Sequence, residues 1–371
     1  MRYLLTGGGT AGHVNPALAI ADTIKANDPE AEIAYVGTPH GMENTLVSRE
    51  GYKMYHVDVR GFRRSLSPKN IKAVWLALTS PYRAEKIIDE FKPDFVIGTG
   101  GYVSWPVLVA AARKKVPCAV HEANAVPGVT VARLEKYVDT VFLNFAETSK
   151  KLRHPEKHMH VGCPLRAGFS KTGGEFKKPE NANAYVLCYG GSLGAGKINE
   201  AMLGVFASGD SRLENTAFCL STGERNYVDF KAKFSEAGLC NNSNIEIMSY
   251  IFDMPVRLKE ADIVISRSGA ITLSELALLG KCAILIPSPN VTNDQQYKNA
   301  KLLADKNAAV LIREKDLTAE RLADEIAKLS TSPALRAQIE KNVREFAVAD
   351  SNKRIYEEIV RLIKEKKNQR R

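Results

Sequence analysis

A glycine-rich turn near the start of the chain is the first place where the residue types could do chemistry. Residues 7–13 read Gly-Gly-Gly-Thr-Ala-Gly-His, with a strand-like run before them and a helix-length segment after them. Such a turn presents backbone N–H groups and the positive end of a helix dipole to an anion. We therefore expect an anionic ligand here. The second strand-like run ends at Gly37 and Thr38 without an acidic residue for a ribose, which disfavours NAD.

His13 follows the last glycine of this turn directly. A lone histidine is usually a structural residue. A helix N-terminus, however, lowers the pKa of a histidine and favours the neutral form that can act as a base. The sequence leaves both roles open for His13. Glu122, within the stretch His-Glu-Ala-Asn at residues 121–124, lies just beyond a strand-like run and is a second possible base.

Two stretches in the second half of the chain have the same strand-to-helix character. Residues 191–197, Gly-Ser-Leu-Gly-Ala-Gly-Lys, resemble an ATP-binding loop, but Ile198 stands where its hydroxyl residue belongs. This argues against an ATPase, while the backbone can still hold a diphosphate. Residues 266–275 supply another helix N-terminus. Glu275 is either a ligand for sugar hydroxyls or an ordinary surface glutamate, and Ser268 or Thr272 could be simple helix caps.

The sequence offers no recognisable metal site. It contains no Asp-x-Asp, and no His or Cys cluster has metal-ligand spacing, so we expect neither a metal nor another cofactor. The charge of a diphosphate would then be neutralised by helix dipoles and basic side chains, for which Arg166 and Arg267 are the candidates. Residues 293–297, Asn-Asp-Gln-Gln-Tyr, add neutral amides that can bind hydroxyl groups.

The elements that position these residues follow an α/β pattern. Short apolar runs at residues 3–5, 33–36, 95–97 and 119–120 alternate with helix-length segments such as 16–26 and 103–115. After an aperiodic polar stretch at 171–183, strand-like runs resume at 185–189, 218–220, 245–248, 263–266, 284–286 and 309–312. We predict an α/β fold of two Rossmann-like domains facing across a cleft, at 1–163 and 164–348, with a final helix at about 349–371 returning to the first.

The net charge of the chain limits the classes of partner that it is expected to bind. The chain has 371 residues and a net charge of +10, and this charge attracts nucleic acid, an anionic lipid surface or a phosphate-rich substrate. No nucleic-acid-binding pattern occurs, so we expect no nucleic acid. Residues 60–78 mix cations with apolar side chains, which suits either an anionic membrane surface or a solvated loop and a core-facing helix.

The cysteines and the lack of a leader bear on the compartment. Six cysteines without C-x-x-C spacing predict reduced core thiols. Because no leader and no membrane span is recognisable, we expect a cytoplasmic protein.

Together these stretches resemble the MurG family, the UDP-N-acetylglucosamine transferases that convert lipid I to lipid II in peptidoglycan synthesis. The resemblance covers nearly the whole chain and is carried, in order, by residues 8–14, 98–102, 121–124, 190–195, 266–275 and 294–297. It implies a glycosyltransferase-B fold, UDP-GlcNAc as donor, and undecaprenyl-diphosphate-MurNAc-pentapeptide (lipid I) as acceptor. It also implies a peripheral protein on the cytoplasmic face of the cell membrane.

The same resemblance implies roles for individual residues. The donor would lie in the C-terminal domain and the lipid acceptor against the N-terminal one. Glu275 would hold the ribose, Gln296 the sugar, and Ser192 with the helix at Ala270 the diphosphate. Ala11 replaces a glycine usual in the family, which the turn tolerates if no positive φ is needed there. By the same resemblance, the substrate-binding residues that line the UDP-GlcNAc site would be Thr10, Ala11, Gly12, Asn124, Arg166, Ser192, Ile251, Ala270, Ile271, Thr272, Leu273, Ser274, Glu275 and Gln296.

We expect direct inverting displacement of UDP by the muramyl 4-hydroxyl, with one residue as base. His13 is the first candidate for that base and Glu122 the second. Three rival functions remain: a UDP-GlcNAc 2-epimerase, a transferase that acts on diacylglycerol, and a non-catalytic module that binds a nucleotide sugar. Incubation with the donor alone separates the epimerase from the transferases, and turnover separates both from the binding module.

Overall fold

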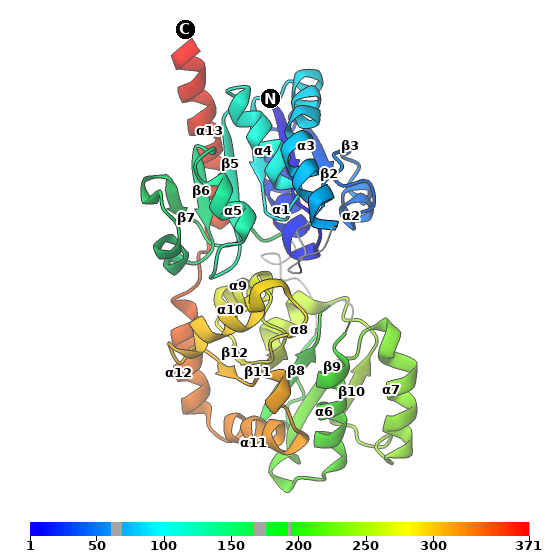
Figure 1. Cartoon of the computed structure of the whole chain (residues 1–371). Coiled ribbons are helices and arrows are strands. Elements are labelled where there is room, and N and C mark those ends of the chain that lie inside the picture. Colours follow the sequence, from blue (N-terminus) through cyan, green and yellow to red (C-terminus); the bar gives the residue numbers. More distant parts are fainter. Residues whose placement is uncertain (61–68, 167–175, 192–193, 371) are drawn as a thin grey trace. The chain divides into compact units, whose positions relative to one another are not determined.

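The chain forms two compact units, each built around one parallel β-sheet (Figure 1). The structure is a computed structural model that describes residues 1–60, 69–166, 176–191 and 194–370. Unit 1 comprises Met1–Ala167 and Val348–Arg371, and unit 2 comprises Gly168–Ala347. The predicted α/β class is confirmed in both units.

Unit 1 contains a seven-stranded sheet in the order β3-β2-β1-β4-β5-β6-β7. Every neighbouring pair is parallel. The strand order reverses between β1 and β4, the place where ligands bind in open α/β sheets. The strands are β1 (Arg2–Thr6), β2 (Glu32–Gly37), β3 (Lys53–His56), β4 (Phe95–Gly98), β5 (Cys118–Glu122), β6 (Thr140–Leu143) and β7 (His158–His160).

Helices cover both faces of this sheet. One face packs against α1 (Ala11–Asn27), α2 (Glu43–Arg49) and α13 (Ser351–Arg370). The other face packs against α3 (Lys69–Phe91), α4 (Ser104–Arg113) and α5 (Val129–Leu134). Because both faces are covered, the inner strands such as β4 and β5 are fully buried, whereas the edge strands β3 and β7 are polar and partly exposed. Short 3₁₀ helices at Ala146–Lys151 and Pro155–Lys157 join β6 to β7.

The last helix belongs to unit 1, where α13 packs against α1. Its apolar side chains Ile355, Ile359, Leu362 and Ile363 enter the core beside α1. Asn352 donates hydrogen bonds to Leu165 O and to Thr23 Oγ1, both 2.9 Å long. Unit 1 therefore includes residues 164–166, beyond the residue 163 at which the sequence pattern breaks.

Unit 2 contains a six-stranded parallel sheet in the order β10-β9-β8-β11-β12-β13. The strands are β8 (Ala184–Tyr189), β9 (Thr216–Ser221), β10 (Ile245–Met248), β11 (Ile263–Ser266), β12 (Cys282–Leu285) and β13 (Val310–Leu311). The helices are α6 (Gly196–Ala207), α7 (Glu224–Glu236), α8 (Met254–Glu260), α9 (Ala270–Leu279), α10 (Gln295–Ala304), α11 (Ala319–Ser330) and α12 (Pro333–Arg344). Three 3₁₀ turns lie at Ser211–Leu213, Thr292–Asp294 and Glu314–Asp316.

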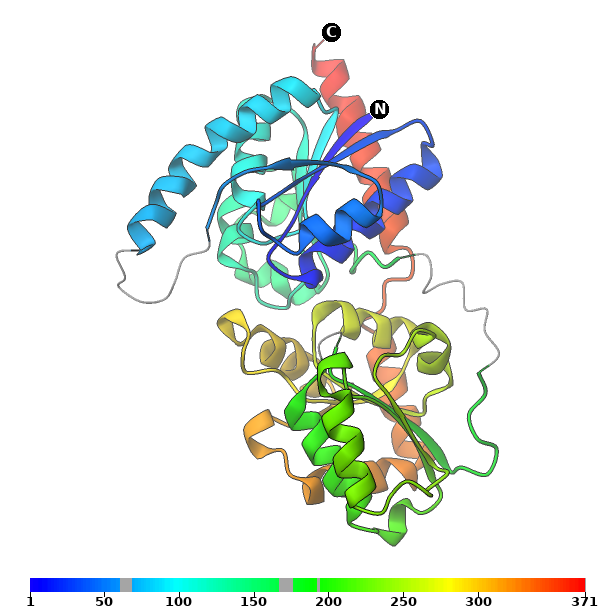
Figure 2. The same ribbon diagram turned by 90° about the vertical axis from the view of Figure 1, so that its right-hand side faces the viewer.

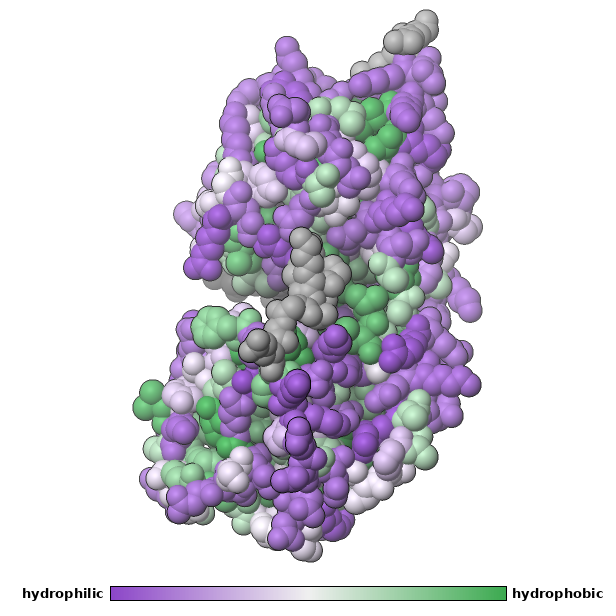
Figure 3. All heavy atoms as spheres, turned by 180° about the vertical axis from the view of Figure 1, so that it is seen from behind, coloured by the Kyte–Doolittle hydropathy of each residue, from purple (hydrophilic) through white to green (hydrophobic). Residues whose placement is uncertain are grey.

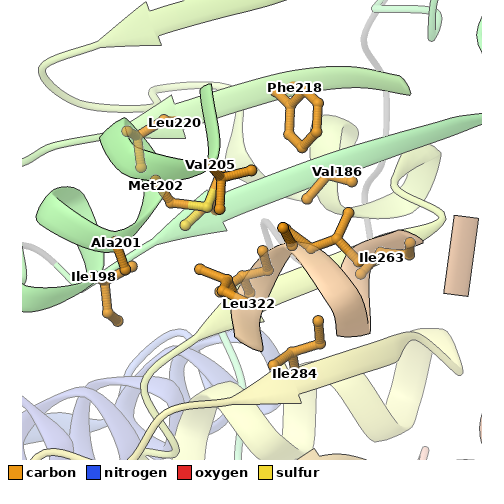
Figure 4. Close-up of a cluster of buried hydrophobic side chains, with 14 of the residues drawn as sticks. Val186, Ile198, Ala201, Met202, Val205, Phe218, Leu220, Ile263, Ile284 and Leu322 are labelled. Carbon is orange, nitrogen blue, oxygen red and sulfur yellow. The ribbon is translucent and has the colours of Figure 1, made fainter. Parts of the chain in front are cut away.

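The core of unit 2 joins the sheet to α6 and α11. Figure 4 shows Met202 and Val205 of α6 and Leu322 of α11 beside Val186 and Ile263 of the central strands. These side chains are at least nine-tenths buried. Burial of a full aliphatic side chain contributes about 1.5–3 kcal/mol, so this layer fixes the sheet whose strand ends carry the candidate site.

Two expectations need correction. Helix α1 begins at Ala11 rather than at residue 16, because Pro16 is accommodated inside the helix, and His13 therefore lies in its first turn. Five cysteines are buried and free, as expected for core thiols, but Cys240 is exposed. It lies in the irregular segment between α7 and β10, where no strand or helix carries its side chain into a core.

The surface is largely hydrophilic, in line with the 25% of charged residues in the sequence. Figure 3 shows hydrophilic residues over most of one face, with apolar residues in small groups among them. Among the described residues, none of the helices combines the length and the apolar character needed to cross a membrane.

Candidate active site

The strand order of unit 1 brings three candidate stretches to one sheet edge. Strands β1, β4 and β5 are neighbours and parallel, so their carboxyl ends lie side by side. The turn at residues 7–10 follows β1, the turn at 99–103 follows β4, and His121 and Glu122 end β5. The sequence stretches that resembled the family's signatures in this half thus meet at the point where the strand order reverses.

The two glycine turns pack closely against each other. A Cβ on Gly101 would collide with Gly8 O, and Gly101 has a φ of +77°, which an L side chain rarely adopts. Thr99 Oγ1 donates to His13 O at 2.6 Å, which fastens the second turn to the start of α1. Ala11 is the first residue of α1, so it needs no positive φ and replaces a glycine without strain.

His13 lies in the first turn of α1, after the N-cap residue Thr10. Its Nδ1 is 3.5 Å from Thr10 Oγ1. Desolvation, and then the neighbouring His121, lower the pKa of His13 to about 4, while Glu43 opposes the shift. His13 is therefore neutral near pH 7, the form that a general base requires. Gly12 is exposed beside it, as is Thr10.

Glu122 is buried and fully occupied with local hydrogen bonds. Its Oε1 accepts from the backbone N and the side-chain Nδ2 of Asn124, at 2.9 and 3.0 Å, and its Oε2 accepts from Gly128 N at 2.8 Å. Burial raises the pKa of Glu122, and these bonds oppose the rise. A carboxylate with both oxygens engaged fits the role of holding the 124–128 loop better than that of a base.

Glu43, which no sequence pattern singled out, lies against the first glycine turn. It opens α2, and its carboxylate lies at the end of β2, where the sequence showed no acidic residue. Its Oε1 accepts from Thr38 N and Thr38 Oγ1, and its Oε2 accepts from Gly9 N at 3.4 Å. The signal available in the sequence was the acidic residue six positions after Gly37. An anion of the chain itself therefore lies against the first glycine turn.

Arg166 is paired with carboxylates of unit 1. Its guanidinium donates to Asp22 at 2.9 Å and to Glu50 at 2.6 Å. Hydrogen bonding to Arg166 lowers the pKa of Glu50. In unit 2, Arg267 donates to Ile286 O at 3.0 Å and pairs with Glu314. Both candidate arginines are thus engaged in ion pairs within their own units.

Unit 2 repeats the arrangement of parallel strand ends. Neighbouring strands β8, β11 and β12 carry the turn at residues 190–195, the start of α9 and the segment leading to α10. Gly191 and Gly194 adopt φ values of +88° and +74°. Ser192 lies outside the described residues. Helix α9 has Gly269 as its N-cap residue, with no side-chain cap hydrogen bond, so no side chain of its own caps the positive end of its dipole.

The predicted binding residues of α9 differ in how accessible their side chains are to a ligand. Ala270, Ile271, Thr272, Ser274 and Glu275 are partly accessible. Leu273 is buried and its N–H donates to Gly269 O, so it contributes packing rather than a ligand contact. Ser268 is not a cap, because its hydroxyl donates to Gln296 O at 2.9 Å. This bond joins the start of α9 to α10.

Glu275 and Gln296 have environments suited to a polar ligand. Desolvation raises the pKa of Glu275 to about 8. Gln296 Oε1 accepts from Ser288 N at 2.8 Å, which orients its amide in the first turn of α10. A carboxyl pKa displaced by burial marks Glu275, in the second turn of α9, as a candidate functional residue.

Aromatic side chains flank Ile251 in unit 2. Ile251 is buried, whereas Tyr250 and Phe252 are exposed, and the two rings lie edge-to-face with centroids 4.9 Å apart. Ile251 was predicted from the sequence as a binding residue, whereas Tyr250 and Phe252 were not. Exposed aromatic rings near a strand edge can stack on a planar ligand.

Across the described parts of both units, no three His, Cys, Asp or Glu side chains gather in a group able to hold a metal ion.

Comparisons with known proteins agree with this architecture. The model of the glycosyltransferase family 28 N-terminal domain matches residues 3–143, and that of the family 28 C-terminal domain matches residues 185–355. Among solved structures, MurG of Acinetobacter baumannii is similar with a TM-score of 0.78 and 27% identity, over 97% of this chain and 99% of that one. A UDP-GlcNAc 2-epimerase from Neisseria meningitidis shares the fold, with a TM-score of 0.67 and 13% identity, over 97% and 100% of the chains.

Two relatives are named UDP-N-acetylglucosamine–N-acetylmuramyl-(pentapeptide) pyrophosphoryl-undecaprenol N-acetylglucosamine transferase. That of Acetivibrio thermocellus is 40% identical over 99% of each chain. That of Lactococcus lactis subsp. cremoris is 36% identical over 96% of this chain and 98% of its own. The predicted glycosyltransferase-B fold and the resemblance drawn from short stretches are both confirmed. With matching family models in both units and such relatives along almost its whole length, this chain belongs to the MurG family within glycosyltransferase family 28.

Proposed function

We propose that this protein transfers N-acetylglucosamine from UDP-GlcNAc to the muramyl 4-hydroxyl of lipid I, forming lipid II for peptidoglycan synthesis. The observation that carries the proposal is the 40% identity to a transferase of that name over 99% of both chains. The residues that could do this chemistry lie at the carboxyl ends of the strands in both units, where α/β enzymes bind ligands.

The donor site is assigned to unit 2. The uncapped start of α9 faces the diphosphate, whose charge the helix dipole stabilises. Glu275 accepts hydrogen bonds from the ribose, and Gln296, held by Ser288, contacts the sugar. Tyr250 supplies an aromatic face for the uracil ring. These roles are supported by the burial and orientation of the groups and by the family resemblance.

The acceptor site is assigned to the strand edge of unit 1, with His13 as base. The muramyl 4-oxygen forms a bond to the anomeric carbon from the face opposite UDP, and the anomeric carbon–oxygen bond to UDP breaks. His13 takes the hydroxyl proton, and UDP leaves with the bonding electron pair. The low pKa of His13 keeps it neutral before the step, and the start of α9 stabilises charge on the leaving group.

Helix α3 is assigned as the surface that contacts the membrane. Trp75, Leu78 and Tyr82 lie on one side of this helix and are 55%, 67% and 61% exposed. Figure 2 shows the first turns of α3 extending past the sheet of unit 1. Exposed Arg83 and Lys86 follow on the same helix, and cations beside apolar side chains suit an anionic bilayer surface. Residues 61–68 of the predicted membrane segment, and the side chains as far as residue 74, lie outside the described part of the structure.

This placement supports a protein bound peripherally to the cytoplasmic face of the membrane, where a lipid-linked acceptor is accessible from the water phase.

The deciding experiment is transfer of radiolabelled GlcNAc from UDP-GlcNAc to a lipid I analogue in EDTA. A parallel reaction contains the donor alone and is analysed for epimerised sugar. We expect labelled product only when the acceptor is present. Formation of ManNAc from the donor alone would instead identify an epimerase, and binding of UDP-GlcNAc without turnover would identify a binding module. Product from diacylglycerol but not from lipid I would identify the remaining rival.

The role of His13 is tested by His13→Ala. Loss of a general base typically lowers kcat by about 10²- to 10⁴-fold, while binding of UDP-GlcNAc to unit 2 should stay unchanged. Near-normal turnover by this variant would remove His13 from the mechanism.

A further inference from the structure

Glu43 is a buried carboxylate that the proposed reaction does not yet use. Its side chain is fully buried, with a relative exposure of 0%. It receives hydrogen bonds from Thr38 N at 2.8 Å, Thr38 Oγ1 at 2.7 Å and Gly9 N at 3.4 Å. An unpaired buried carboxylate is costly, and these three hydrogen bonds offset part of that cost.

Three glycines make room for this carboxylate. A Cβ on Gly8 would lie 2.8 Å from Glu43 Oε1, and a Cβ on Gly37 would lie 2.6 Å from Glu43 Cγ. A Cβ on Gly41 would collide with the carboxylate itself. The backbone at the ends of β1 and β2 therefore packs closely around the carboxylate, and a side chain at any of these three positions would collide with Glu43.

The turn that Glu43 holds leads straight to His13. Gly9, whose N–H donates to Glu43, is followed by Thr10, the N-cap residue of α1. Thr10 O accepts from His13 N at 3.0 Å, and Thr10 Oγ1 lies 3.5 Å from His13 Nδ1. When Nδ1 carries the proton, Thr10 Oγ1 accepts it in a hydrogen bond and Nε2 is the nitrogen with a free lone pair.

The groups with charge or titratable protons around this turn act in different directions. His121 and desolvation lower the pKa of His13, whereas Glu43 raises it. Tyr35 donates to Gly7 O at 2.7 Å, and burial, with Glu43 adding to it, keeps the pKa of Tyr35 well above its ordinary value. Tyr35 is therefore a neutral donor, and Glu43 is the group that favours the protonated form of His13.

We propose that Glu43 is a positioning residue for the transfer reaction: it fixes the glycine turn before His13 and supplies the buried negative charge that stabilises His13 after proton uptake. This inference rests on the proposed function. In the step itself, His13 Nε2 gains the proton of the muramyl 4-hydroxyl as the new glycosidic bond forms, and UDP leaves with the electrons of the old one. Glu43 touches neither substrate and acts through the turn and His13.

The test compares Glu43→Gln, which removes the charge and keeps the shape, with Glu43→Asp, which keeps the charge. The first measurement is NMR titration of the His13 ring in protein with labelled histidine, assigned with His13→Gln. We expect the His13 titration to move to lower pH in Glu43→Gln and to stay near the wild-type position in Glu43→Asp. An unchanged His13 titration in folded Glu43→Gln would overturn the proposal.

Kinetics give the second readout. Glu43→Gln should lower kcat at least about ten-fold at pH 7, because it removes the negative charge that stabilises the protonated form of His13. Glu43→Asp should recover part of that kcat. Glu135→Gln is the matched control, since Glu135 is also buried and binds loop N–H groups of Arg153 and His154. If Glu135→Gln lost as much kcat as Glu43→Gln, the effect of Glu43 would be structural only and the inference would fail. If the wild-type protein transferred no GlcNAc to lipid I, the proposed function itself would fail.

Discussion

Gly100 lies directly against the ring of His13. A Cβ on Gly100 would be 3.0 Å from His13 Cδ2 and 3.1 Å from His13 Nε2. Gly100 also has a φ of +105°, a backbone conformation that L side chains rarely adopt. The turn after β4 thus forms one wall of the space in which His13 must accept a proton.

Gly100→Ala is expected to lower kcat by about 10- to 100-fold, because displacement of a positioned base by a fraction of an ångström costs this much. The backbone strain adds about 1 kcal/mol or more of lost stability. The measurements are kcat with lipid I and the thermal midpoint Tm. Gly51→Ala is the control, since Gly51 has a φ of +75° but nothing within 4 Å of its Cβ position. Gly51→Ala should lose stability and keep the wild-type kcat. A loss of kcat in Gly51→Ala equal to that in Gly100→Ala would show that backbone strain, and not displacement of His13, lowers the rate.

His121 should make the protein less stable in mild acid. It is fully buried with Nε2 2.9 Å from Gly162 O, and burial lowers its pKa to about 4 although that bond opposes the shift. Below pH 6.5 the unfolded chain binds a proton at this residue and the folded chain does not. The free energy of unfolding should therefore fall by about 2 kcal/mol from pH 7 to pH 5 through this group alone.

Urea unfolding of wild type and His121→Gln at both pH values checks this expectation. The variant should show a smaller difference between pH 7 and pH 5 than wild type. His40→Gln, at an exposed histidine, should leave the difference as it is. Equal pH dependence in wild type and His121→Gln would show that His121 does not contribute.

Glu275 should make donor binding depend on pH. Its pKa is raised to about 8, so its carboxyl is mostly protonated at pH 7 and ionises as the pH passes through 8. The ionised form accepts hydrogen bonds from both ribose hydroxyls, so the affinity for UDP should rise by about five- to ten-fold from pH 7 to pH 8.5. Calorimetric titration with UDP at pH 7 and at pH 8.5 measures this change in affinity. The trend should vanish in Glu275→Gln and persist in Glu236→Gln, an exposed control on α7.

Replacement of the exposed apolar residues of α3 should release the protein from membranes. An apolar side chain buried in the bilayer interface contributes up to about 1.5–3 kcal/mol, so Trp75→Ser with Leu78→Ser should weaken binding to phosphatidylglycerol-containing vesicles at least about ten-fold. Transfer to a short-chain, water-soluble acceptor analogue should be retained. Val228→Ser, at a 79% exposed apolar residue of unit 2, is the control and should leave vesicle binding intact. Unchanged binding by the double variant would move the membrane contact elsewhere.

Much of the fold could be predicted from local sequence. The strand-like runs at residues 245–248 and 263–266 coincide with β10 and β11. All four residues of β11 are buried, so it is a continuous apolar run, whereas β10 is an edge strand that exposes Glu246. The glycine turns before His13 and before α6 were also recognisable, since only glycine freely supplies the positive φ of Gly9 and Gly191. The limits of α1 were less certain, because Pro16 resembles a helix start and is instead inside the helix.

Local sequence is enough to predict the α/β class, the division into two units and the strand-to-helix turns that can bind anions, because periodicity, glycine and helix starts act over a few residues. Contacts between distant residues had to come from the fold: Glu43 accepts from Gly9 N across 34 positions, and Arg166 pairs with Asp22 across 144. The fold also decided that Glu122 holds its own loop, which weakens its claim as a base. These contacts depend on the order and register of parallel strands, which long-range packing sets and local sequence does not specify.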